Sequence, residues 1–277
     1  PRVVDVHAHA MPFPVLRWLE SVDLADLSER DRAIVRIDPR VSGVGARAPL
    51  PLAPSMTDPS LRLAEMDAAG IEIEAVSLPP FLAATMCDDD DLVHQVVRRG
   101  NDALAEFCAA APDRLVPLGT IPVGVPGAVD EAERCLDRLA MRGATIGSRG
   151  GGRELDDPVN ESLWAVLAER RTFVFLHPSA VPEPSRLSDF WFPQLVGYPI
   201  ETTIAVARLA FAGVLERHPL VLCLAHGGGC LPSLRGRLDM GWERKEIAHT
   251  TSVPPRTLFD RLYYDTAVFD ANTICRF

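Results

Sequence analysis

The first residues in the chain that could support catalysis are two histidines close to its start. His7 and His9 lie one residue apart in the apolar run 3–9. Alternate side chains of a β-strand project from the same face, so both imidazoles could bind one metal ion. On a helix the two side chains would diverge by about 200°. The spacing also fits an ordinary strand with a polar face, so the other histidines must decide between the two interpretations.

Two further histidines, His177 and His226, each end a strand-like apolar run, and three glycines follow the second of them. Imidazoles are the usual ligands of catalytic metal ions. We therefore predict that His7, His9 and His177 bind one metal. His226 could be a fourth ligand or a general base, because imidazole titrates near neutral pH and can move a proton beside a metal-bound water.

Seven strand-like runs alternate with helical segments along the chain. We expect the strands at 3–9, 71–78, 115–122, 143–148, 173–177, 220–226 and 262–268. This alternation indicates an α/β fold with a parallel sheet, and a (β/α)8 TIM barrel is its economical closure. Such barrels carry catalytic residues at the carboxyl ends of their strands, where the four histidines fall. A doubly wound sheet would need a glycine-rich phosphate turn after the first strand, and residues 7–12 do not supply one.

The predicted barrel has one long insertion and one gap. Residues 11–56 are rich in Pro, Arg and Gly, and we expect a loop-rich insertion there with a short helix near 13–20. We predict a single domain over 1–277. The eighth strand–helix unit is expected to be missing from the given chain, since a last helix begins near Asn272.

Composition excludes several classes of partner. The 277 residues are 47% hydrophobic and carry a net charge of −10, and no basic run occurs, so we expect no nucleic-acid partner and a small-molecule substrate. No apolar run reaches about 18 residues, which argues against a membrane partner. The six cysteines form no Cys-x-x-Cys pair and indicate reduced thiols. With no signal peptide before the first strand, we expect a cytoplasmic protein.

Two carboxylates near the histidines have competing interpretations. Asp5 should point away from His7 and His9 and tether nearby backbone or arginine groups. Asp265 ends the seventh predicted strand and could be a metal ligand or a structural residue. The glycines after His226 superficially match an esterase oxyanion segment, but no Gly-x-Ser-x-Gly turn exists, which excludes a serine hydrolase of that type.

Several segments together resemble the amidohydrolase superfamily, and within it the branch typified by aminocarboxymuconate semialdehyde decarboxylase. The resemblance rests on residues 5–9, 177–178, 190–203 and 225–229. It implies that His7, His9 and His177 bind one divalent ion, usually Zn²⁺, with Mn²⁺ as another choice. It also implies that His226 activates the metal-bound water.

The same resemblance suggests residues that contact the substrate. Arg237 matches an arginine that reaches a substrate carboxylate in the neighbouring subunit, which implies a homodimer and a small anionic substrate. Trp191 lies in the most specific stretch of the resemblance and is expected to bind substrate. Arg47 is the nearest candidate for a second substrate arginine. The family's aspartate ligand belongs to the eighth strand and is not Asp265, and the fourth strand has no lysine to bridge two metals.

From these features we predict a mononuclear, metal-dependent, non-oxidative decarboxylase of a small unsaturated or aromatic carboxylic acid. The alternative is a hydrolase or hydratase that uses the same metal site on an ester, lactone, amide or alkene. A third possibility is a catalytically inactive barrel that only binds a ligand. The fold alone does not separate them, because one metal site can serve all these reactions.

Overall fold

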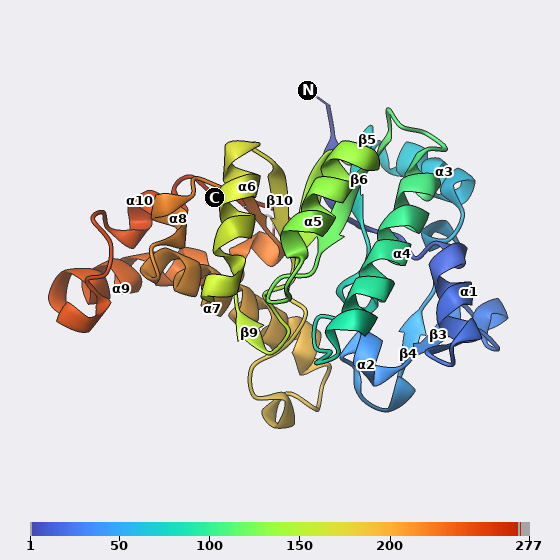
Figure 1. Cartoon of the computed structure of the whole chain (residues 1–277), viewed down its shortest axis with the longest axis horizontal. Coiled ribbons are helices and arrows are strands. Elements are labelled where there is room, and N and C mark those ends of the chain that lie inside the picture. The colour runs from blue at the N-terminus through green and yellow to red at the C-terminus, as the bar shows by residue number, and fades with distance from the viewer. Residues whose placement is uncertain (1, 271, 273–277) are drawn as a thin grey trace. The chain divides into compact units, whose positions relative to one another are not determined.

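The computed structural model describes residues 2–270 and 272 (Figure 1). The chain divides into two compact units. The first contains residues up to 122 together with 130–145, and the second contains 123–129 together with the residues from 146 onward. His7 and His9 belong to the first unit, whereas His177 and His226 belong to the second.

The first unit is built on parallel strands covered by helices. Its strands are neighbours in the order β1 (Val4–His9), β5 (Ile73–Ser77), β6 (Leu115–Ile121) and β7 (Gly143–Ile146). The β1–β5 and β5–β6 pairs are parallel, as the sequence predicted. The helices are α1 (Phe13–Ser21), α3 (Pro59–Ala69), α4 (Asp90–Cys108) and α5 (Ala128–Glu133), which continues as a π-helical turn over Arg134–Arg138. Figure 1 shows α4 alongside β6 and α1 beside α4.

Local sequence explains where α3 and α4 begin and end. The Asp58 carboxylate caps α3 by accepting hydrogen bonds from the backbone N–H groups of Ser60 and Leu61. Gly70 ends the helix with a left-handed φ of 69°, a conformation that glycine adopts without strain. Asp89 caps α4 in the same way, and the acidic residues of its first turn complement the helix dipole. Both helices lie in the predicted helical segments between strand-like runs.

The insertion at 11–56 contains more regular structure than the sequence indicated. The predicted short helix is present as α1. Three short strands form an antiparallel sheet in the order β2 (Ala25–Asp26), β3 (Ile34–Ile37) and β4 (Pro49–Pro51), with α2 (Pro39–Ser42) between the last two. The single domain over 1–277 remains a prediction.

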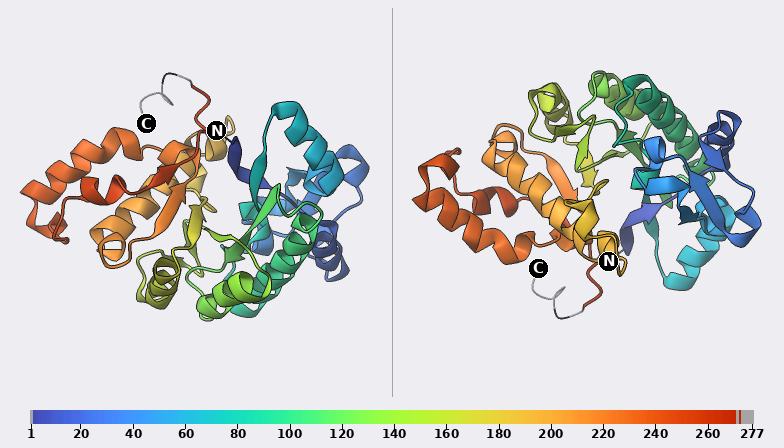
Figure 2. Two further views of the ribbon diagram at one scale, coloured as in Figure 1. Left: turned by 90° about the horizontal axis from the view of Figure 1, so that it is seen from above. Right: turned by 90° about the horizontal axis from the view of Figure 1, so that it is seen from below.

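The second unit has its own parallel strands, β10 (Phe173–Leu176), β11 (Val221–Leu224) and β12 (Tyr263–Tyr264), in that order. Its helices are α6 (Glu161–Glu169), α7 (Tyr198–Phe211), α8 (Val214–Arg217), α9 (Leu231–Arg244) and α10 (Pro255–Phe259). A small antiparallel pair joins β8 (Arg149–Gly150) to β9 (Arg153–Glu154). Helices α9 and α10 lie side by side in both views of Figure 2.

Two predicted elements of the second unit differ from the structure. The helical segment expected between the strands 173–177 and 220–226 is broken into α7 and α8, because Gly213 takes a left-handed φ of 73°. The strand expected over 262–268 is only the two residues of β12. The helix expected to begin near Asn272 falls, apart from that residue, outside the described part of the chain.

Each unit has a buried core that fixes its strands. Leu104, Leu115 and Leu118 are fully buried in the first unit, and Trp164 and Phe175 are fully buried in the second. Burying such a side chain contributes about 1.5–3 kcal/mol, so the strand ends that carry the histidines rest on well-anchored backbone. Of the helices in the described residues, none combines the length and apolar character needed to cross a membrane.

Candidate metal and proton-transfer site

The two histidines of the first unit end strand β1. Their ring centroids are 5.2 Å apart with the rings nearly perpendicular, which agrees with the prediction that both side chains project from one face. Asp5 of β1 pairs with Glu74 of β5, and Ala8 pairs with Val76. The segment of β1 is one residue longer than that of β5, so β1 has a bulge between Asp5 and Ala8. The Asp5 carboxylate accepts the backbone N–H of His7 at 2.8 Å and secures this bulge. The predicted tethering role of Asp5 is thereby confirmed.

His9 is held by a second layer of buried groups. Its Nδ1 lies 3.0 Å from Ser77 Oγ, and that hydroxyl is also 3.5 Å from the Ala8 carbonyl oxygen. When the hydroxyl donates to this carbonyl, it accepts from Nδ1–H, and the lone pair of His9 is then on Nε2. Such a partner fixes the tautomer and orientation of a metal-binding histidine.

A buried ion pair supports the same strand end. Arg62 on α3 pairs with Glu74 on β5, and both residues are 7% exposed. Arg62 also donates a hydrogen bond to the His9 carbonyl oxygen at 2.8 Å. The guanidinium therefore links the helix, the neighbouring strand and the backbone of the candidate ligand.

In the second unit, His177 directly follows β10 and is 7% exposed. Its backbone N–H donates to the Ile146 carbonyl oxygen at 3.0 Å. The ring Nδ1 lies 2.9 Å from the Pro178 carbonyl oxygen. Because a carbonyl can only accept, this contact requires a proton on Nδ1, so Nε2 is the nitrogen that carries the lone pair when the ring is neutral. The contact also fixes the orientation of the ring.

His226 lies in a sharp turn two residues beyond the end of β11. Its φ of 58° is in the left-handed region, and the three glycines that follow also have positive φ angles. Its ring centroid is 5.1 Å from that of His177. The Tyr198 ring is stacked on the His226 ring, with the two centroids 6.2 Å apart. Burial raises the pKa of the Tyr198 phenol, which therefore keeps its proton at neutral pH.

The first turn of α7 packs against the turn that carries His226. Thr203 Oγ1 accepts the backbone N–H of Cys230 at 2.8 Å. A Cβ placed on Gly229 would lie 1.9 Å from the Pro199 carbonyl oxygen, so only glycine fits there. On the same helix, the buried Glu201 carboxyl lies 3.0 Å from Ser148 Oγ, and burial raises its pKa.

The predicted substrate-binding residues are in different surroundings. Trp191 is 66% exposed with a positive φ of 61°, and Arg237 is exposed on α9. In the first unit, Arg47 donates to the Asp23 carbonyl oxygen at 2.5 Å and forms ion pairs with the Asp23 and Asp38 carboxylates. Within each unit the structure brings the histidines together, and the substrate-binding roles of these three residues stay predictions.

Sequence reasoning missed Ser77 and Arg62, and it left the role of Asp265 open. Ser77 could have been found, because it is a polar residue at the carboxyl end of the predicted strand 71–78, next to the histidine strand. Arg62 gave no such signal, since it is one of several charged residues on a predicted surface helix. Asp265 accepts the backbone N–H groups of His226 and Gly227, which identifies it as a structural residue of the turn.

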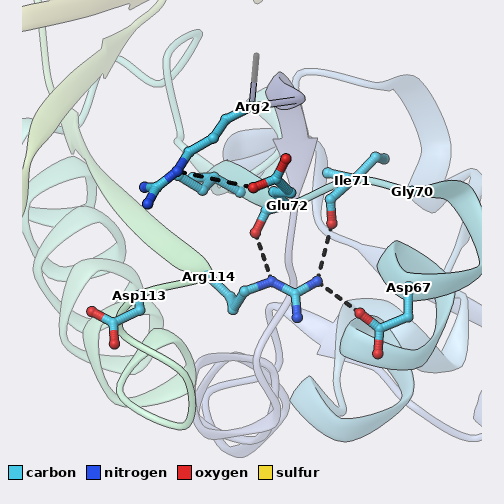
Figure 3. Close-up of a pocket in the computed structure, with 8 residues that line it drawn as sticks. Arg2, Asp67, Gly70, Ile71, Glu72, Asp113 and Arg114 are labelled. Carbon is cyan, nitrogen blue, oxygen red and sulfur yellow. Dashed lines mark hydrogen bonds and ion pairs between the residues drawn. The ribbon is translucent and has the colours of Figure 1, made fainter.

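The first unit also has a solvent-filled hollow of about 660 Å³ at the opposite, amino-terminal ends of its strands (Figure 3). Two of its ion pairs are Arg2 with Glu72 and Arg114 with Asp67. Arg114 donates to the Glu72 and Ile71 carbonyl oxygens and to the Asp67 carboxylate. These contacts tie the residues before β5 to those before β6. In α/β barrels this end of the strands contributes to stability rather than to catalysis.

The histidine nitrogens of each unit are of a kind that binds a divalent metal ion. When Nδ1 of His9 or His177 donates to its oxygen partner, Nε2 is the remaining ring nitrogen. His7 adds another imidazole to the first unit, and imidazoles bind zinc and manganese.

Comparison with known proteins identifies the family. The profile of the amidohydrolase family matches residues 4–277. The chain is 29% identical to 2-amino-3-carboxymuconate-6-semialdehyde decarboxylase of Dictyostelium discoideum over 78% of its length, and 32% identical to gamma-resorcylate decarboxylase of Rhizobium sp. over 64%. It spans about three fifths of each relative, 61% and 58%.

A solved structure has the same fold. The chain superposes on the dihydroxybenzoic acid decarboxylase of Polaromonas sp. JS666, determined with bound manganese and the inhibitor 2-nitroresorcinol, with a TM-score of 0.74 at 22% identity. The match covers 99% of this chain and 81% of that one. The predicted α/β barrel class is confirmed by this likeness, and the predicted family by the profile. The chain therefore belongs to the amidohydrolase family.

Proposed function

We propose that the protein is a metal-dependent, non-oxidative decarboxylase of a small unsaturated or aromatic carboxylic acid. The observation that carries the proposal is the pair of histidines in the second unit. His177 offers a metal-binding nitrogen, and His226 lies beside it in a constrained turn from which it can transfer a proton. The relatives named above are decarboxylases of such acids, which supports this reaction.

We propose that His7, His9 and His177 hold one divalent ion, Zn²⁺ or Mn²⁺. When bound, the ion supplies a Lewis acid that stabilises negative charge developing on the substrate. The groups that fix the tautomers, the Ser77 hydroxyl and the Pro178 backbone carbonyl, keep the ligand nitrogens available. Manganese in the Polaromonas enzyme supports an ion of this class.

His226 provides the proton. In a non-oxidative decarboxylation the bond between the carboxylate and the adjacent carbon breaks, carbon dioxide leaves, and the electron pair stays on that carbon. The carbon then takes a proton from the His226 imidazolium, which afterwards recovers one from solvent. Proton transfer of this kind contributes about 10²–10⁴-fold to a rate.

Binding of the substrate carboxylate is assigned to arginine, which matches a carboxylate with two parallel hydrogen bonds. We propose that Arg237 of one protomer serves the site of its partner in a homodimer. Trp191 would contact the substrate ring or chain. Arg47 can take part only if it exchanges its contacts with Asp23 and Asp38 for the substrate.

The cytoplasm is the proposed location. Five cysteines of the described residues are free thiols, and four of these are buried. Burial raises the pKa of Cys108 and Cys223 to about 12, so these thiols remain protonated and unreactive. Such unpaired thiols are typical of proteins in a reducing compartment.

Carbon dioxide release tests the proposal directly. The Zn²⁺- or Mn²⁺-loaded protein is incubated with a panel of acids that includes 2,6-dihydroxybenzoate, and the gas is quantified. We expect release that falls about 10²–10⁴-fold in His226→Ala, with the metal content unchanged. His249→Ala, at an exposed histidine of the same unit, should retain parental activity. Cleavage of esters or lactones without gas would instead establish the hydrolase, and absence of stoichiometric metal would indicate an inactive barrel.

A further inference from the structure

The turn that carries His226 is held in a conformation that the sequence alone does not favour. His226 and Gly227 have φ angles of 58° and 59°. For a residue with a Cβ, the left-handed region costs about 1–2 kcal/mol. Such a conformation persists only where the surrounding structure determines it.

Asp265 supplies the groups that determine this conformation. It directly follows β12 and is 4% exposed. Its Oδ2 accepts the His226 N–H at 3.0 Å, and its Oδ1 accepts the Gly227 N–H at 2.7 Å. Both carboxylate oxygens are therefore used on consecutive backbone amides of the turn.

The Asp265 backbone anchors this arrangement to the sheet. Its N–H donates to the carbonyl oxygen of Leu224, the last residue of β11, at 3.1 Å. The Ala267 N–H donates to Oδ1 at 3.1 Å and fixes the carboxylate from the other side. Asp265 therefore bonds both to the end of β11 and to the start of the turn.

The next two residues of the turn, Gly228 and Gly229, are tightly packed against neighbouring elements. A Cβ on Gly228 would lie 2.6 Å from Cε1 of Tyr264, and the equivalent atom on Gly229 would meet the Pro199 carbonyl oxygen at 1.9 Å. The turn is therefore wedged between β12 and α7. If the hydrogen bonds to the His226 and Gly227 N–H groups were lost, the His226 ring would move, because the tightly packed Gly228 and Gly229 cannot shift to compensate.

We propose that Asp265 is a positioning residue for His226: its carboxylate holds the left-handed turn and thereby fixes the imidazole beside His177. The expected effect of Asp265 on turnover rests on the proposed decarboxylase activity. Its effect on the conformation of the turn is independent of that activity. Asp265→Asn is the informative change, because the amide keeps the shape but can accept through only one atom, and its NH₂ group faces a backbone N–H.

The first test measures the turn without any substrate. Amide hydrogen exchange at His226 and Gly227, and the Cε1–Hε1 NMR resonance of the His226 ring, are recorded for the parent and for Asp265→Asn. We expect faster exchange at these two amides and a shifted or broadened ring resonance. The matched control is Asp157→Asn, since this carboxylate also accepts a backbone N–H, from Val159 at 3.0 Å. The control should leave both signals unchanged.

The second test is a double-mutant cycle on carbon dioxide release. Asp265→Asn should lower kcat about 100-fold with little change in KM, the loss typical of a small displacement of a catalytic group. In the His226→Ala background the same substitution should have no further effect on kcat, because it acts through that ring. Equal losses in both backgrounds would overturn the positioning role.

The two tests separate the inference from the proposed function. Unchanged hydrogen exchange and an unchanged ring resonance in Asp265→Asn would refute the inference whatever the enzyme does. Changes in both signals, together with no carbon dioxide release from the parent, would leave the turn assignment intact and refute the decarboxylase.

Discussion

The two histidine-bearing regions are held in place by different means. In the first unit, His9 ends a strand and is fixed by side chains, Ser77 on its ring and Arg62 on its carbonyl oxygen. In the second unit, His226 lies in a glycine-rich turn and is fixed through its backbone, by the Asp265 carboxylate. A metal ligand needs one lone pair aimed at a fixed point, whereas a proton donor needs a ring held beside the reacting carbon. Under the proposed roles, the buried network of the first unit orients the ligand His9, while the strained turn of the second unit places the proton donor His226.

The largest expected effect is on stability, from breaking the buried Arg62–Glu74 ion pair of the first unit. Arg62→Met leaves Glu74 as an uncompensated buried charge, so the free energy of unfolding should fall by about 3–5 kcal/mol, measured by urea denaturation. The double variant Arg62→Met/Glu74→Leu should recover most of this loss, because apolar side chains replace a buried pair at little cost. A single variant within about 1 kcal/mol of the parent would contradict the role given to Arg62.

The turn of the second unit can be broken at Gly229. Gly229→Ala puts a Cβ against the Pro199 carbonyl oxygen in a residue with a φ of 63°, so we expect a loss of about 2–4 kcal/mol from overpacking and backbone strain. The control is Gly236→Ala on α9, where nothing lies within 4 Å of the new Cβ. That variant should be stabilised by about 0.5–1 kcal/mol. Similar melting temperatures for the two variants would show that the turn is not wedged.

Ser77→Ala tests how tightly the ligands of the first unit are oriented. Without the hydroxyl, the His9 ring can rotate and change tautomer, and the affinity for Zn²⁺ should fall about 10–100-fold in a competition titration. An unaltered zinc affinity would show that Ser77 does not orient His9 for metal binding.

The smallest effect concerns acid stability of the second unit. Hydrogen bonds from Arg217, and then His218, lower the pKa of Glu161 to about 2 from its ordinary 4.5. A depressed carboxyl pKa stabilises the fold above the unfolded value and loses that contribution as the pH falls from 4.5 towards 2. The side chain is 44% exposed, so solvent screening limits the gain to about 1 kcal/mol or less. Glu161→Gln should flatten the unfolding free energy in this pH window, whereas an unchanged slope would contradict the assignment.

The sequence predicted the elements whose signals are local. The alternation of strands and helices depends on neighbouring residues, and the structure has it where expected. The Asp58 cap and the Gly70 terminus of α3 depend on equally local features. The same logic placed His7 and His9 on one strand face, because β-strand periodicity is simple. The antiparallel sheet β2–β4 was not predicted, since its strands have two to four residues and β4 begins and ends with proline.

Features that depend on distant contacts could not be read from the sequence. The bulge in β1 depends on its register against β5, and the break between α7 and α8 on one left-handed glycine. Asp265 is 39 residues from His226 in sequence, so its hold on the turn becomes visible only when β12 pairs with β11. Strand ends could be predicted, but the backbone turn beyond them could not.

A crystal structure of the zinc-loaded protein, with an anomalous difference map collected at the zinc edge, tests the central claim most directly. We expect one peak about 2.0–2.1 Å from one ring nitrogen of each of the proposed ligands His7, His9 and His177. We also expect that His226 stays outside bonding distance of the ion. Zinc bound elsewhere, or no peak at these three nitrogens, would contradict the proposed site.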